Sequence, residues 1–155
     1  MTPDQEKQWN EFGCAPRCLL ELSKRKGKTI SRDTLVQKYD QKYPDWKTRC
    51  GITDTGGIID IARDFNLCTS AVSIRNKEHI KRRLNKNPNL DILVLTDIIN
   101  NDPDQECFHC MLLLSFDHKN SNWSLWNPNQ DGTDSEGVVT DTRLEELCAH
   151  FLVLA

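Results

Sequence analysis

The spacing of apolar residues changes near the middle of the chain, and this change restricts the fold class more than any other feature. In the first half, apolar residues recur at helical spacing, as Leu19 and Leu22 do. In the second half they form short continuous runs at 91–96 and 108–116, which are typical of buried strands. Helices that precede a mostly antiparallel sheet define an α+β fold.

Turn and cap residues divide the chain into predicted elements. Gly27 and Pro44 end two helices, and Asp141 or Thr142 caps the last one. The short polar segment 117–122 predicts an antiparallel hairpin of the two strands around it. We expect residues 1–155 to form a single domain, because a chain of this length suits one core. The predicted helices cover about 14–26, 31–43, 58–66, 77–85 and 143–150, and the predicted strands cover about 68–74, 91–96, 108–116 and 122–126.

Charge and composition exclude several classes of function. Twenty basic and 23 acidic residues give a net charge of −3, which argues against a general nucleic-acid binder. No apolar run approaches the roughly 18 residues that span a bilayer, and the N-terminus does not resemble a signal peptide. We therefore expect a cytoplasmic protein, or one delivered into another cell without a readable signal. Seven cysteines without a secretion signal favour free thiols over a disulfide framework.

Cys14 is the best-placed nucleophile among these cysteines. It follows Gly13 at the start of a predicted helix, where unpaired N–H groups and the helix dipole stabilise a thiolate. The sequence therefore predicts a lowered pKa for the Cys14 thiol. Cys18 lies one turn further on among leucines, and we expect it to belong to the core.

Three further residues complete a catalytic constellation around a thiol. His109 begins the strongest apolar strand, where a rigid sheet can hold an imidazole as a general base. Asn127 follows the neighbouring strand and can orient that imidazole. Gln8, six residues before Cys14, can donate a side-chain N–H to an oxyanion.

In this order and spacing, the residues resemble the papain-like cysteine peptidases, and most closely the bacteriocin leader peptidases that cleave after a double glycine. The likeness covers roughly residues 6 to 132. The stretches that carry it are Gln8-Trp-Asn-Glu-Phe-Gly-Cys14-Ala-Pro-Arg-Cys18-Leu19, Ser31 to Tyr39, Gly51-Ile-Thr-Asp-Thr-Gly-Gly-Ile58 through Leu67, His109-Cys-Met-Leu-Leu-Leu114 and Trp126-Asn127-Pro128. Gly13 and Ala15 depart from the family's Asp-Cys-Gly core, and Asn127 stands where the family usually has Asp.

The resemblance implies a papain-like fold, with N-terminal helices packed on an antiparallel sheet. It implies a thiol hydrolase that cleaves an amide bond of a peptide or protein substrate through a Cys14–His109–Asn127 triad, with Gln8 at the oxyanion. Such an enzyme needs no cofactor and no metal, and we expect it to act as a monomer. Bacterial effector glutamine deamidases use a similar scaffold, so deamidation of a protein glutamine is the alternative activity.

Other interpretations of the same residues remain open. Cys14-x3-Cys18 and Cys107-x2-Cys110 supply two thiol pairs, as a structural zinc site would require. Cys107-Phe-His-Cys110 also has the spacing of a redox motif, although such motifs normally open a helix. A non-catalytic peptide-binding module is the third possibility.

Overall fold

The computed structural model describes residues 2–47, 55–97 and 108–155. Within these ranges the helices are α1 (Pro3–Phe12), α2 (Cys14–Arg25), α3 (Arg32–Lys42), the short 3₁₀ helix η1 (Pro44–Lys47), α4 (Thr55–Asp64), α5 (Lys77–Lys86) and α6 (Asp141–Glu146). The strands are β1 (Ala71–Ile74), β2 (Asp91–Asp97), β3 (Phe108–Asp117), β4 (Asn122–Pro128), β5 (Asp134–Thr140) and β6 (His150–Leu154). The mixture of helices with an antiparallel sheet confirms the predicted α+β class.

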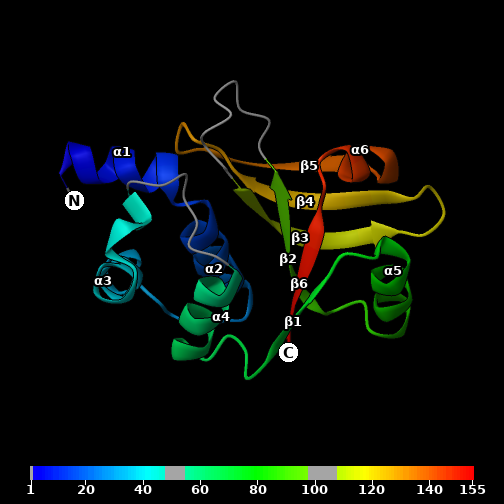
Figure 1. Cartoon of the computed structure of the whole chain (residues 1–155), viewed down its shortest axis with the longest axis horizontal. Helices are drawn as coiled ribbons and strands as arrows, with labels where there is room; N and C mark the ends of the chain where they lie inside the picture. The colour runs from blue at the N-terminus through cyan, green and yellow to red at the C-terminus, as the bar shows by residue number, and fades with distance from the viewer. Residues whose placement is uncertain (1, 48–54, 98–107) are drawn as a thin grey trace.

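One sheet of six strands runs through the molecule. Its strand order is β1-β6-β2-β3-β4-β5, and every neighbouring pair is antiparallel. Helices α1 to α4 gather on one side of this sheet, and α5 and α6 lie on the other (Figure 1). The predicted hairpin of β3 and β4 is confirmed, with Asp117 paired to Asn122 next to the turn.

Side chains alternate along each strand and so divide between two cores. The first core joins the sheet to α1 to α4 and includes Cys14, Cys110 and Leu112. The second core joins the sheet to α5 and α6 and includes Met111 and Leu113. Both faces of the central strands are therefore covered, which is why these strands appear in the sequence as continuous apolar runs.

Local capping explains where most helices begin and end. Thr2 and Gln5 form a reciprocal capping box at the start of α1, and Ser31 accepts a hydrogen bond from Thr34 N at the start of α3. After α2 the chain turns at Gly27, which has a φ of +72°. The predicted boundary at Gly27 is confirmed. Gly51 to Asp54, which begin one of the stretches that carry the family resemblance, lie outside the described residues.

The prediction of a last helix over 143–150 is wrong in its second half. Helix α6 ends at Glu146, the chain reverses through Cys148 at a φ of +51°, and His150 begins β6. All five residues of β6 are buried because the strand lies between β1 and β2 with both faces covered. An apolar run of this length does not distinguish a buried strand from a helix by its period.

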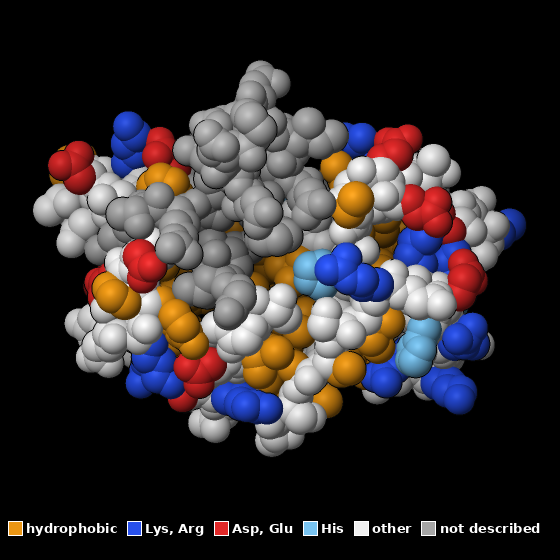
Figure 2. Space-filling view, in the orientation of Figure 1, with side chains coloured by type: hydrophobic (Ala, Val, Ile, Leu, Met, Phe, Trp, Pro, Cys, Tyr) orange, Lys and Arg blue, Asp and Glu red, His pale blue; other side chains and the backbone are white. Residues whose placement is uncertain are grey.

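Helix α5 carries most of the basic residues of the second half, and carboxylates pair with two of them, Lys77 and Lys81. Lys81 Nζ lies 2.9 Å from Glu78 Oε1 and 2.5 Å from Asp141 Oδ2, and Lys77 Nζ lies 2.9 Å from Glu145 Oε1. Positive and negative side chains are interspersed over this part of the surface (Figure 2). In the part of the chain that the structure describes, no helix is long and apolar enough to cross a membrane.

Candidate active site

Cys14 is the first residue of α2, directly after the sharp bend that separates α2 from α1. The bend is possible because position 13 is glycine. A Cβ at Gly13 would lie 2.2 Å from the carbonyl oxygen of Trp9, a distance that no side chain tolerates. Gly13 therefore allows α1 to end and α2 to begin without a linker, and it places Cys14 at the positive end of a 12-residue helix.

The environment of Cys14 is more buried than the sequence predicts. Only 9% of the residue is exposed, and burial raises the pKa of its thiol to about 12. Backbone hydrogen bonds with Cys110 and Ala15 and the positive charge of Arg17 oppose this shift without cancelling it. The predicted lowering of the Cys14 pKa is therefore wrong in this structure, because desolvation outweighs the helix terminus.

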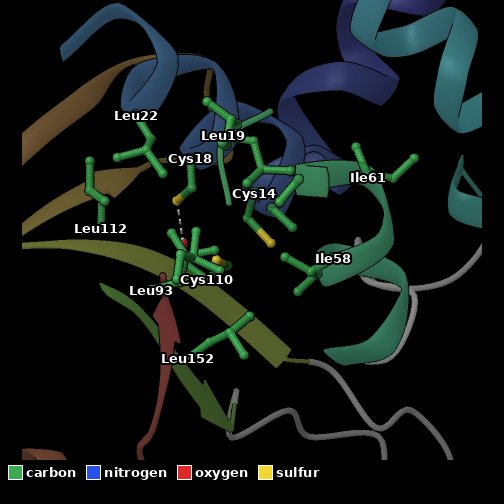
Figure 3. Packing of buried hydrophobic residues seen from close by; sticks show 14 of the residues in the cluster. Cys14, Cys18, Leu19, Leu22, Ile58, Ile61, Leu93, Cys110, Leu112 and Leu152 are labelled. Atoms are coloured by element: carbon green, nitrogen blue, oxygen red, sulfur yellow. Dashed lines mark hydrogen bonds between the residues drawn. The ribbon is translucent and has the colours of Figure 1, made fainter. Parts of the chain in front are cut away.

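Three buried thiols meet between α2 and β3. Cys18 Sγ donates a hydrogen bond to the carbonyl oxygen of Cys110 at 3.3 Å, and the side chains of Cys14 and Cys18 point from α2 toward Cys110 (Figure 3). Cys18 is fully buried, which confirms that it belongs to the core. The Tyr39 hydroxyl is buried close to these thiols and has no hydrogen-bond partner among the described residues.

His109 and Asn127 are brought together by the hairpin of β3 and β4. Their side chains are hydrogen bonded through His109 Nε2 and Asn127 Oδ1. An amide oxygen only accepts, so Nε2 carries the proton and Nδ1 is the basic nitrogen. Burial lowers the pKa of His109, and Arg17 adds to this effect, while the Asn127 hydrogen bond opposes it. The imidazole is therefore neutral at pH 7.

Cys14 packs against β3, the strand that carries His109. The Cys14 thiol is hydrogen bonded to the backbone of Cys110, the residue that follows His109. Alternation along β3 directs the Cys110 side chain into the first core, while His109 shares its side of the strand with Met111. By this alternation, the Cys14 thiol lies on the first-core side of β3, and the His109 side chain belongs to the opposite side of the strand.

Gln8 lies on α1, one turn before the bend at Gly13. Its side chain is half-buried, and its neighbour Trp9 is packed in the first core. Its role as an oxyanion donor stays a prediction.

The other three histidines have different surroundings. His79 on α5 accepts a hydrogen bond from Arg83 Nε at 3.0 Å, and His118 is exposed in the turn between β3 and β4. His150 is only 8% exposed at the start of β6. It pairs with Leu95, which in turn pairs with Cys110, so His150 and Cys110 occupy one row across three strands.

The described residues contain no group of three or more His, Cys, Asp or Glu side chains that could hold a metal ion. Cys107, which the zinc and redox interpretations both require, lies outside the described residues. A cavity of about 340 Å³ lies elsewhere, between the start of α5 and the end of α6, and is lined by Arg75 to Glu78 and by residues 144–145 and 148–149. None of the candidate catalytic residues lines it.

Arg17 is the residue near the site that sequence analysis missed. It is 7% exposed, and its charge acts on Cys14, Cys18 and His109. Arginine is rarely buried, so a single arginine on a predicted helix gives no signal of such a role.

The chain matches no protein-family model, and no curated protein is significantly similar to it.

Proposed function

We propose that this protein is a papain-like thiol hydrolase that cleaves an amide bond in a peptide or protein substrate. The observation that carries the proposal is the hydrogen bond between His109 Nε2 and Asn127 Oδ1. It gives the imidazole the tautomer that a general base beside a thiol requires. The position of Cys14 at the start of a buried helix against β3 also supports the proposal.

The protonation states favour one of the two routes by which a thiol can be activated. The Cys14 thiol, with a pKa of about 12, and the His109 imidazole, with a lowered pKa, are both neutral at pH 7. His109 Nδ1 then takes the Cys14 proton during attack on the carbonyl carbon, as a general base. A preformed thiolate–imidazolium pair would require the opposite shifts.

The remaining steps follow from the same groups. The tetrahedral oxyanion would be stabilised by the backbone N–H of Cys14 and by Gln8. His109 would return the proton to the leaving amine, and water would then hydrolyse the acyl-enzyme. If the attacked carbonyl belongs to a glutamine side chain, the leaving group is ammonia and the product is a glutamate.

The decisive experiment is acylation of Cys14 by p-nitrophenyl acetate, read by peptide mass mapping of the acetylated residue. We expect acetylation of Cys14 in the wild type and a loss of about a hundredfold or more in rate in His109→Ala. His118→Ala is the matched control, because His118 is exposed in a turn, and it should retain the wild-type rate.

Equal rates of Cys14 acetylation in the wild type and His109→Ala would refute the proposal. The remaining interpretation would then be a non-catalytic peptide-binding module. Should the pair be active, a mixture of synthetic peptides would separate the two reactions. A peptidase cleaves peptides into fragments that are absent when Cys14 is substituted. A deamidase leaves each peptide intact and converts a glutamine into a glutamate.

A further inference from the structure

Arg17 connects α2 to the turn that follows β4. Its guanidinium donates from Nη1 to the carbonyl oxygen of Asn129 at 2.5 Å and from Nη2 to that of Thr133 at 2.8 Å. The two acceptors are 112 and 116 residues away in sequence. Charge-assisted hydrogen bonds made by a planar fork fix orientation as well as distance.

The turn formed by residues 129–133 is already closed by its own hydrogen bonds. Asn129 N donates to Thr133 O at 2.8 Å, and Gly132 N donates to Asn129 O at 3.1 Å. Each of the two carbonyl oxygens therefore accepts one bond from within the turn and a second from Arg17. A carbonyl oxygen has two lone pairs and can accept two hydrogen bonds, so Arg17 supplies the second hydrogen bond to each of these two oxygens.

The two ends of this connection lie close to the candidate catalytic residues. Arg17 is three residues after Cys14 on the same helix, and Asn129 is two residues after Asn127. Asn127 is in turn hydrogen bonded to His109. The guanidinium thus joins the helix that carries the thiol to the strand end that orients the imidazole.

The charge on Arg17 also acts on the candidate catalytic groups. Burial lowers the pKa of the guanidinium itself, and the surrounding Cys18, Asp134, Cys14 and Asp131 oppose that effect. The positive charge favours the thiolate of Cys14 and disfavours the imidazolium form of His109. The first effect eases removal of the Cys14 proton, and the second keeps His109 in the neutral form that can accept a proton.

We propose that Arg17 is a positioning residue, which locks the 129–133 turn onto α2 and thereby holds His109 and Asn127 in place relative to Cys14. This inference rests on the proposed thiol hydrolase function. Arg17 touches neither substrate nor the reacting atoms in this arrangement, and it acts through the turn and through its charge.

The test compares Arg17→Lys, which keeps the charge without the planar fork, with Arg17→Gln, which removes the charge. We expect Cys14 acetylation by p-nitrophenyl acetate to slow about tenfold or more in both variants. The NMR titration midpoint of His109 should rise in Arg17→Gln and stay near the wild-type value in Arg17→Lys. A purely structural role would not separate the two variants in this way.

Arg25 provides the matched control. It lies on the same helix and also reaches the β4–β5 hairpin, 3.3 Å from Glu136, but its side chain is exposed. Arg25→Gln should leave both the acetylation rate and the His109 titration unchanged.

Folded Arg17 variants with wild-type acetylation rates would overturn the proposal. If Arg17→Gln does not fold, Arg17→Lys decides, because amide exchange at Asn129 and Gly132 must quicken when the fork is lost. If amide exchange at Asn129 and Gly132 and the acetylation of Cys14 both keep their wild-type rates in Arg17→Lys, the proposal is also overturned. Failure of the proposed thiol hydrolase function would give a different result. Cys14 of His109→Ala would then be acetylated at the wild-type rate, while Arg17→Gln would still raise the titration midpoint of His109.

Discussion

Asn127 Oδ1 accepts a hydrogen bond from His109 Nε2, and the two residues are 18 positions apart on neighbouring strands. The bond leaves His109 Nδ1 as the basic nitrogen of the ring. The same amide opposes the lowering of the His109 pKa by burial. Asn127 thus influences both which ring nitrogen of His109 is unprotonated and the pH above which the neutral imidazole predominates.

Substitution of Asn127 should separate these two effects. In Asn127→Ala, loss of the acceptor frees the ring, and Cys14 acetylation should slow by up to about tenfold. In Asn127→Asp, the carboxylate still accepts from Nε2 and favours the imidazolium, so the pKa of His109 should rise. The pH–rate profile of acetylation should then keep its height and move to higher pH. An Asn127→Ala variant with the wild-type acetylation rate and pH profile would exclude an orienting role.

The raised pKa of Cys14 predicts how stability depends on alkaline pH. A group whose pKa is higher in the folded state stabilises the fold below its unfolded pKa, near 9, and this stabilisation is lost as pH rises toward 12. Between pH 9 and about pH 10.5 the wild type should lose about 2 kcal/mol more than Cys14→Ala. Urea unfolding at both pH values, with reductant present, measures the difference. Cys148→Ala, at an exposed position, should match the wild type.

The sequence predicted the contact between His109 and Asn127, but it did not predict the environment of Cys14. The pairing of His109 with Asn127 follows from a local hairpin, whose polar turn and flanking apolar runs are visible in the sequence. The pKa of Cys14 depends on how deeply the start of α2 is buried between the sheet and the other helices. No local pattern around Cys14 reports that depth, so the helix-terminus argument gave the wrong sign.

Other differences between sequence and structure have equally specific causes. The contact between Arg17 and the 129–133 turn spans more than a hundred residues, and only the assembled fold creates it. Helix α1 and strand β5 were missed because most of their side chains are exposed or only half-buried, which leaves no apolar period to detect. Only Trp9 of α1 is buried.

Gly13 should be among the glycines least tolerant of substitution in the described chain. A Cβ there would lie 2.2 Å from backbone, which cannot rotate away, so Gly13→Ala must shift α1 relative to α2. We expect a loss of about 1–3 kcal/mol in the free energy of unfolding and slower Cys14 acetylation. Gly137→Ala is the control, since a Cβ at that position meets nothing within 4 Å. Chemical denaturation that gives the same midpoint for both variants would contradict this account of the bend.

His150 is the histidine that could replace His109 as the base, and the sheet register allows a direct test. It shares a row with Cys110, two strands away, which places the two Cα atoms about 10 Å apart. Alternation along β6 directs His150 toward the first core, where Cys14 lies, whereas His109 carries the Asn127 hydrogen bond. Because the Asn127 hydrogen bond fixes the tautomer of His109, we expect His109→Gln to lose about a hundredfold or more in Cys14 acetylation. On this hypothesis His150→Gln should keep the wild-type rate. The reverse result, with both variants folded by circular dichroism, would transfer the role of base to His150 and leave His109 and Asn127 as a structural pair.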